Sequence, residues 1–227
     1  MPIDRPRIRA LCFDLDGTLS DTDDLFVLKL ARWLKIVRLA FPQRDPLPIA
    51  RYLVMRTETP GNVLHGLPDR LGIDGWMART GDQFYRLGLG RSPQPFLIIP
   101  GVAEMLAHLH GRLPLSVVSA RGQRSAQWFL EQFDLSRFFH CVATAQTCRY
   151  TKPYPDPVLW AAEQMGVPPE ACLMIGDTTV DILAGKAAGA QTVGVLCGFG
   201  EEDELRRAGA DLILPATPHL LDVFGQP

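Results

Sequence analysis

Two carboxylates spaced two residues apart are the first candidates for chemistry in this chain. Asp14 and Asp16 follow an apolar run at residues 8–13 and precede Gly17 and Thr18. Such a run is typical of a strand buried on both faces, and ligands of α/β sheets bind beyond the carboxyl ends of the strands. Neighbouring carboxylates repel each other unless a cation or a shared proton offsets the charge. We therefore expect an acidic, metal-loaded site directly after the first strand.

Residues 14–17 also have a simpler, purely structural interpretation. Asp-x-Asp-Gly is also a common turn, and a similar sequence opens calcium-binding loops. The calcium loop is excluded because Gly17 comes two residues too early and no Glu follows at the required spacing, where the chain offers Asp23. The turn stays open as an alternative to a metal site.

Further polar residues stand where other strands are expected to end. Ser119 follows the apolar run 115–118, Lys152 lies in the loop after the run 141–143, and Asp177 and Asp181 follow the run 172–175. The strands of a parallel sheet point the same way, so these side chains should converge on one edge with Asp14 and Asp16.

Strand and helix patterns alternate over most of the chain. Strands are expected at 8–13, 115–118, 141–143, 172–175, 192–196 and 211–214, and helices at 100–110, 121–133, 156–165, 178–188, 201–208 and 219–224. Alternation of this kind implies right-handed βαβ units. We predict an α/β fold with a doubly wound, Rossmann-like parallel sheet.

One stretch breaks this alternation. Residues 20–96 show helical spacing of apolar residues and no strand pattern, and they end in a Gly- and Pro-rich segment at 88–95. We therefore expect residues 1–19 and 97–227 to form the α/β core and residues 20–96 to form an inserted helical domain.

Composition narrows the class of protein. The chain has 227 residues, 47% hydrophobic and 21% charged, which is enough to bury a core. A net charge of −2 gives no basic footprint for nucleic acid. The five cysteines show no Cys-x-x-Cys and indicate a reducing compartment. No run reaches the length of a membrane span, so we expect a cytoplasmic protein that is a monomer or a homodimer.

The polar residues, taken in order, resemble the four motifs of the haloacid dehalogenase superfamily of phosphoryl-transfer enzymes. Asp14 to Thr18 matches its Asp-x-Asp-Gly-Thr motif, Ser119 its second motif, Lys152-Pro153 its third, and Gly176 to Asp181 its Gly-Asp-x-x-x-Asp motif. The insertion is similar in position and helical character to that superfamily's C1 cap. Within the superfamily the chain looks like the phosphoglycolate phosphatases and β-phosphoglucomutases.

The resemblance implies a role for each motif residue. Asp14 would be the nucleophile and a Mg²⁺ ligand, with the Asp16 backbone carbonyl and the Asp177 carboxylate as the other protein ligands. Asp181 would support the metal indirectly, through a water molecule or by orienting one of these ligands. The Asp16 side chain would act as general acid and then as general base. Phosphate would be bound by Thr18, Ser119, the N–H of Ala120, and Lys152.

Each of these residues also has a purely structural interpretation. Ser119 could cap the following helix, and Lys152 could be an exposed loop lysine. Asp177 could be a helix N-cap, and Asp181 an exposed first-turn acid favoured by the helix dipole. The convergence of all of them on one edge is what favours function.

The leading hypothesis is a Mg²⁺-dependent phosphatase that hydrolyses a small phosphorylated metabolite through an aspartyl-phosphate. Asp16 disfavours dehalogenation, since the dehalogenases of the superfamily lack an Asp there. A sugar-phosphate mutase would need cap residues such as Arg51 or Arg56 for a second phosphate, and a phosphonatase would need Lys29 or Lys35. A non-catalytic phospho-acceptor module, like a response-regulator receiver, would need neither the insertion nor Asp16.

Overall fold

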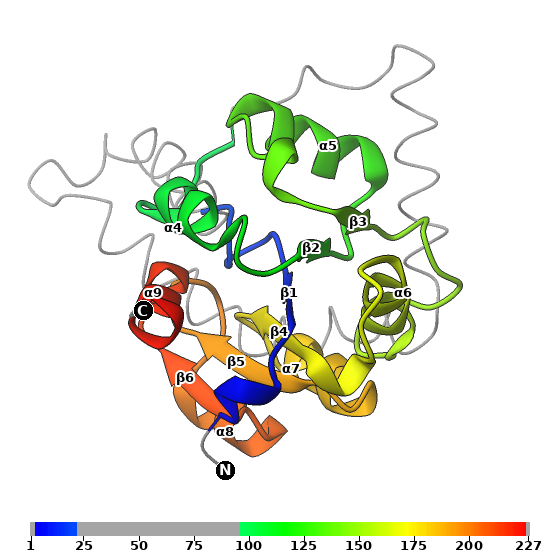
Figure 1. Ribbon diagram of the computed structural model, residues 1–227, viewed down its shortest axis with the longest axis vertical. Coiled ribbons are helices and arrows are strands. Elements are labelled where there is room, and N and C mark those ends of the chain that lie inside the picture. Colours follow the sequence, from blue (N-terminus) through cyan, green and yellow to red (C-terminus); the bar gives the residue numbers. More distant parts are fainter. Residues whose placement is uncertain (1–2, 22–95, 226–227) are drawn as a thin grey trace, which may run out of the picture.

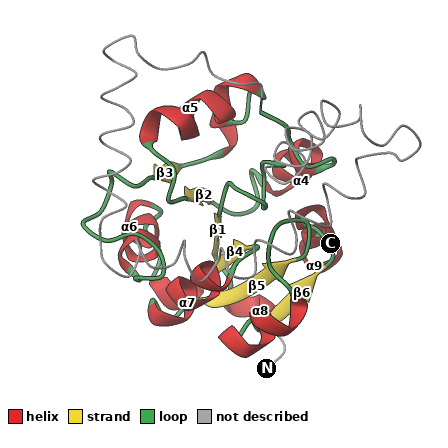
Figure 2. Cartoon of the chain, turned by 180° about the vertical axis from the view of Figure 1, so that it is seen from behind, coloured by secondary structure: helices red, strands yellow, loops and turns green. Residues whose placement is uncertain are grey.

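Six short strands form one parallel sheet in the computed structural model, which describes residues 3–21 and 96–225. The strands are β1 (Ala10–Phe13), β2 (Leu115–Val118), β3 (Cys141–Ala143), β4 (Cys172–Gly176), β5 (Gln191–Val195) and β6 (Leu212–Leu214). Their order in the sheet is β3-β2-β1-β4-β5-β6. Figure 2 shows the strands running through the middle of the molecule with helices on either side. The predicted doubly wound α/β fold is confirmed.

Helices cover both faces of this sheet. They are α4 (Val102–Leu109), α5 (Gln123–Gln132), α6 (Asp156–Gln164), α7 (Thr179–Ala187), α8 (Glu202–Ala208) and α9 (Leu220–Phe224), joined by the 3₁₀ turns η1 (Arg5–Arg7), η3 (Ser136–Phe138), η4 (Pro169–Ala171) and η5 (Thr217–His219). Leu11 and Phe13 of β1 pack in one apolar cluster with α4, α5 and α9. Ala10 and Cys12 point the other way, into a cluster with α6 and α7. Figure 1 shows these two groups of helices on opposite sides of the sheet.

Small residues let α7 lie close against the sheet. A Cβ atom built on Gly185 would stand 2.6 Å from Thr192 Cγ2 and 2.9 Å from Met174 Cβ. The cluster on this face is also rich in alanine, with Ala161 and Ala184 fully buried. Close packing of this kind fixes α7, which begins beside the predicted site.

The element limits differ from the sequence prediction chiefly at turns. Residues 121–122 were expected in a helix, but α5 begins at Gln123, with Gly122 as its N-cap. The reason is that the Ser119 hydroxyl accepts the Arg121 N–H at 3.1 Å, which closes a separate turn after β2. The first strand likewise begins at Ala10 instead of Ile8, because η1 precedes it.

The chain leaves and re-enters the sheet at one place, the carboxyl end of β1. The Asp21 N–H donates to the Leu97 carbonyl at 2.9 Å, the Ile99 N–H donates to the Leu19 carbonyl at 3.0 Å, and Ser20 bridges Ile98. The rest of the predicted helical insertion, 22–95, lies outside the described residues, so the division into core and cap stays a prediction. No helix in the described parts of the chain is long and apolar enough to cross a membrane.

Candidate active site

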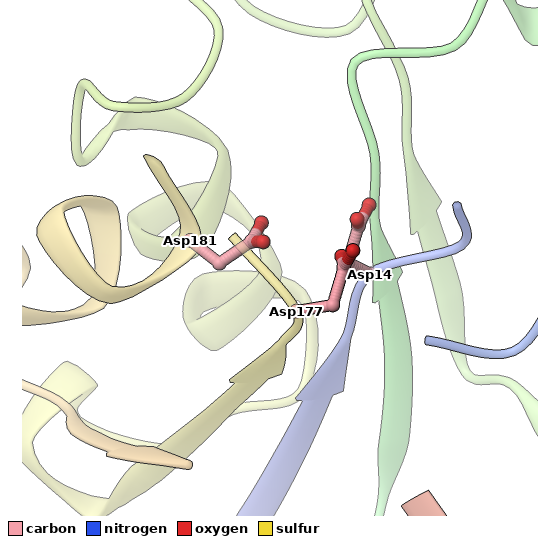
Figure 3. Close-up of side chains that lie close together, drawn as sticks. All are labelled: Asp14, Asp177 and Asp181. Atoms are coloured by element: carbon pink, nitrogen blue, oxygen red, sulfur yellow. The ribbon is translucent and has the colours of Figure 1, made fainter. Parts of the chain in front are cut away.

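Three aspartates meet at the point where the strand order reverses. β1 pairs with β2 on one side and with β4 on the other, which is the position where doubly wound sheets bind ligands. Asp14 follows β1, Asp177 follows β4 and Asp181 lies in the first turn of α7. Each offers a carboxylate oxygen, and these three oxygens lie within 4.8 Å of one another. Figure 3 shows the three side chains directed toward a common space.

Asp14 is a buried carboxylate with a buried ammonium against it. Lys152 Nζ lies 2.7 Å from Asp14 Oδ1, and the two side chains are 3% and 8% exposed, respectively. Burial raises the pKa of Asp14 to about 7, and Asp181 and Asp16 add to the rise, while Lys152 opposes it. Asp14 therefore needs more positive charge than Lys152 supplies if it is to be fully ionised at neutral pH.

Lys152 joins the first and last motifs. Its Nζ also donates to Asp181 Oδ1 at 2.6 Å. Burial alone would lower the pKa of Lys152, but Asp14 and Asp181 raise it above its ordinary value. The peptide bond from Lys152 to Pro153 is cis. Because the Lys152 side chain is buried, the alternative of an exposed loop lysine is wrong.

Asp181 has both of its oxygens engaged. While Oδ1 takes Lys152, Oδ2 accepts the Thr178 N–H at 3.0 Å and the Thr178 hydroxyl at 2.7 Å. Thr178 and Asp181 thereby form a capping box at the start of α7. The alternative of an exposed first-turn acid is wrong, because Asp181 is fully buried. Asp181 holds Lys152 and the helix end together.

Asp177 is held by backbone and side-chain donors around it. Its Oδ2 accepts the Phe199 N–H at 2.8 Å, and its Oδ1 accepts the Thr18 hydroxyl at 3.4 Å. The alternative of a helix N-cap does not hold, since Thr178 is the N-cap of α7.

Two glycines let the chain pass beside Asp177. A Cβ on Gly17, where φ is +68°, would lie 2.2 Å from Asp177 Oδ2, and a Cβ on Gly198 would lie 2.1 Å from it. Any side chain at either position would displace the carboxylate.

The predicted phosphate-binding residues lie at the same edge. Ser119 and Thr18 are buried and Ala120 is exposed. Ser119 continues the sheet through its N–H to the Ala143 carbonyl, and the Thr217 hydroxyl donates to the Thr18 carbonyl at 2.6 Å. Ser119 does not cap α5, so that alternative is wrong as well.

Asp16 has a partner that the sequence reasoning missed. Arg121 Nε donates to Asp16 Oδ2 at 2.9 Å and to Oδ1 at 3.2 Å, and Arg121 Nη2 also pairs with Oδ1. The signal was present, because Arg121 follows Ser119 at the end of β2 and the convergence rule applies to it too. Gly198 and Gly200, which follow β5 and leave no space for a Cβ beside Asp177, were missed in the same way.

The donor set suits a divalent cation. Three buried carboxylates face the single ammonium of Lys152 within the described site, so negative charge is in excess. Hard oxygen donors are what Mg²⁺ prefers. The carboxylates of Asp14, Asp177 and Asp181 lie close enough together to hold such an ion.

A hollow of about 470 Å³ opens elsewhere, before β2 and β3. It is lined by residues 110–115 and 138–140, which precede these strands except for Leu115, the first residue of β2. It therefore lies at the amino edge of the sheet, opposite the aspartates. The residues named from the sequence for the mutase and phosphonatase alternatives, Arg51, Arg56, Lys29 and Lys35, lie outside the described residues.

Known proteins resemble this chain in sequence. Over 131 residues it is 34% identical to the phosphoglycolate phosphatase of Escherichia coli (strain K12), a match that covers 57% of this chain and about half, 52%, of that enzyme. It is 28% identical over 219 residues to pyrophosphatase PpaX of Oceanobacillus iheyensis, covering 96% of this chain and 97% of that protein. It is 31% identical over 206 residues to the probable phosphatase IndB of Dickeya dadantii, covering 89% of this chain and 87% of that protein.

Solved structures share the fold. A hydrolase from Pseudomonas syringae superposes with a TM-score of 0.63 at 24% identity and covers 96% of this chain and 98% of its own. A haloacid dehalogenase-like family protein from Streptococcus pneumoniae superposes with a TM-score of 0.60 at 18% identity and covers 96% of this chain and 99% of its own. The family model of haloacid dehalogenase-like hydrolases matches residues 8–189, from before β1 to just past α7, and so spans all four motifs. The chain belongs to the haloacid dehalogenase-like hydrolase family.

Proposed function

We propose that this protein is a Mg²⁺-dependent phosphatase that hydrolyses a small phosphorylated metabolite through a phosphoryl group carried on Asp14. The observation that supports this most is the buried Asp14 carboxylate, ion-paired with Lys152 and with Asp177 beside it. The phosphatase names of the relatives support the same reaction class.

Asp14 is the proposed nucleophile. A carboxylate that attacks phosphorus forms an acyl phosphate, which splits one difficult hydrolysis into two easier steps. Burial raises the pKa of Asp14 to about 7, so Lys152 and the metal ion are needed to keep it ionised for the attack.

Asp14, Asp177 and the Asp16 backbone carbonyl would hold the Mg²⁺. When bound, the ion supplies positive charge against the anionic substrate and the anionic nucleophile. Asp181 would act on it indirectly by fixing Lys152.

Asp16 is the proposed acid and base. It would give a proton to the leaving oxygen as the P–O bond breaks, and then take a proton from the water that attacks the phosphoryl group on Asp14. Asp16 suits this exchange because its side chain is 35% exposed, unlike that of Asp14.

Lys152, the Ser119 hydroxyl and the Ala120 N–H would bind the phosphoryl oxygens, and Thr18 would steady Asp177. Donors placed where negative charge develops are a large part of catalysis in such sites.

The test is an assay of phosphate release from a panel of phosphorylated metabolites, with Mg²⁺ and with chelator. We expect Mg²⁺-dependent turnover that Asp14→Asn lowers by about 1,000-fold or more, without loss of the folded state by circular dichroism. Asp134→Asn, at a surface residue whose side chain is 76% exposed, is the matched control and should leave turnover unchanged.

Unchanged turnover in Asp14→Asn would refute the nucleophile. Isomerised sugar phosphate in place of free phosphate would favour the mutase alternative.

A further inference from the structure

We infer that Arg121 is a positioning residue that holds the Asp16 carboxylate in the orientation needed for proton transfer. The inference rests on the proposed function, since it concerns the group that exchanges protons there. Arg121 binds both oxygens of Asp16, through Nε to Oδ2 at 2.9 Å and Oδ1 at 3.2 Å, and through Nη2 to Oδ1. A two-point contact between a planar guanidinium and a carboxylate fixes orientation as well as distance.

The guanidinium is itself fixed from its other sides. Its central carbon lies 4.8 Å from the centroid of the Phe96 ring and 5.8 Å from that of Phe129, and the two rings meet edge to face at 5.8 Å. The Gln132 side chain of α5 holds the Phe96 backbone by a bond to its N–H at 3.2 Å and one to its carbonyl at 2.9 Å. The Arg121 side chain is 14% exposed, against 35% for Asp16.

The Arg121 backbone is tied to the proposed phosphate-binding turn. Its N–H donates to the Ser119 hydroxyl at 3.1 Å, and its carbonyl accepts the Ala145 N–H at 2.9 Å. One residue therefore sets the distance between the phosphoryl-binding turn and the proton-exchanging carboxylate.

Arg121 also touches both segments that lead to and from residues 22–95. Nη2 donates to the Ser20 hydroxyl at 3.5 Å on the outgoing segment, and the guanidinium stacks on Phe96 of the returning segment. Ser20 in turn donates to the Leu97 carbonyl at 3.3 Å. The orientation of Asp16 is thus linked to the place where the chain crosses out of the core.

The position of the Arg121 guanidinium has an energetic cost, which indicates that an arginine is needed there. Arg121 Nη1 is buried and has no hydrogen-bond partner among the residues that the structure describes. A buried donor without an acceptor is destabilising, and a shorter or apolar residue would avoid it. What only an arginine provides here is the rigid fork on Asp16.

The consequence is a specific defect when the fork is removed. Proton donation matters most when the leaving group is poor, and a misplaced acid loses about 100-fold for a displacement near 1 Å. Phenyl phosphate and p-nitrophenyl phosphate share the same aromatic ring but differ in their leaving groups. p-Nitrophenolate departs without a proton, whereas phenolate is the poorer leaving group and depends more on proton donation. The ratio of the kcat/KM values for these two substrates depends only on the first chemical step, in which the P–O bond to the leaving group breaks.

The experiment compares both probes on the full chain with Mg²⁺. Arg121→Met should lower kcat/KM for phenyl phosphate by about 10- to 100-fold and for p-nitrophenyl phosphate by less than about 3-fold. Arg121→Lys should restore part of the loss. Asp16→Asn should show the same selective defect, and the Asp16→Asn/Arg121→Met double variant should be no worse than Asp16→Asn. Arg137→Met, at an exposed arginine paired with Asp134, is the matched control.

Equal losses on the two probes, or a gain in activity, would overturn the role assigned to Arg121. If p-nitrophenyl phosphate hydrolysis survives Asp14→Asn, the proposed function fails instead, so the two failures are distinguishable. Circular dichroism shows whether Arg121→Met is folded. If it is unfolded, the two substrates are compared with Arg121→Lys instead.

Discussion

At the scale of single residues, the site is defined by an excess of buried negative charge. Asp14, Asp177 and Asp181 are buried together, and Lys152 bonds to Asp14 and Asp181 at 2.7 and 2.6 Å. The raised pKa of Asp14 is the direct result of burial in this company. The same imbalance that makes the site costly to fold makes it able to hold a divalent cation and an anionic substrate.

This imbalance predicts a pH dependence of stability without metal. The pKa of Asp14 is about 7 in the folded protein, against an ordinary value of 3.8. Its contribution to stability is therefore complete below about pH 4 and is lost as the pH rises through 7. Asp14→Asn stays neutral and so should gain stability relative to the natural protein as the pH rises, by on the order of 2 kcal/mol between pH 5 and pH 8.

Urea unfolding of both proteins in chelator at the two pH values measures this difference. Asp134→Asn, at a surface residue whose side chain is 76% exposed, is the matched control. A stability difference between Asp14→Asn and the natural protein that does not grow with pH would contradict the raised pKa.

At the scale of elements, the site is built from the turns that follow parallel strands. Asp14 follows β1, Ser119 follows β2, Asp177 follows β4, and the loop after β5 brings the Phe199 N–H to Asp177. Gly17 and Gly198 flank Asp177 so closely that neither position has space for a methyl group. The loop after β5 thus belongs to the site through the Phe199 N–H and Gly198.

Gly198→Ala tests this assignment. The added Cβ would meet Asp177 Oδ2 at 2.1 Å, so we expect Mg²⁺-dependent phosphatase activity to fall by about 100-fold, as for other small displacements in active sites. Gly189→Ala is the control for adding a methyl group where there is space, because a Cβ on Gly189, where φ is +82°, would have Glu170 Cγ at 3.6 Å as its nearest neighbour. Gly189→Ala should lower stability through strain and leave activity per folded molecule unchanged. Equal activity in the two variants would exclude Gly198 from the site.

Much of this architecture could be predicted because the signals are local. The runs 115–118 and 141–143 have the limits of β2 and β3, and the helix at 156–165 ends one residue beyond α6. Strand direction then brings Asp14, Asp177 and Asp181 to one edge without further information. By contrast, the Asp16–Arg121 pair joins residues 105 positions apart. Strand direction places both residues at this edge, but it does not predict that they form an ion pair. The start of α5 was missed for a related reason, since the Ser119 side chain closes a turn that apolar spacing does not show.

At the scale of the whole molecule, sheet order decides where the chemistry is located. β1 lies in the middle of the sheet, so Asp14 has β2 and β4 as neighbours and is shielded by helices on both faces. The chain crosses to residues 22–95 and back within hydrogen-bonding distance of itself, close to the same edge. A ligand bound at this edge contacts groups drawn from most of the sequence and should stabilise the fold as a unit.

Metal binding should therefore raise thermal stability. A ligand at 100 times its dissociation constant adds about 2.7 kcal/mol when it binds only the folded state. We expect Mg²⁺ to raise the melting temperature and chelator to reverse the effect. Asp177→Asn, which keeps an oxygen for the Phe199 N–H, should fold but lose the response. A Mg²⁺ response that survives in Asp177→Asn would place the ion elsewhere.

The most direct test of the proposed reaction is to find where the phosphoryl group goes. The enzyme is mixed with Mg²⁺ and p-nitrophenyl phosphate, quenched in acid within the first turnover, digested, and examined by mass spectrometry. The mass of one phosphoryl group should appear on the peptide that contains Asp14, and it should be absent from Asp14→Asn. Turnover with no phosphorylated peptide, or with the phosphoryl group on another residue, would contradict it.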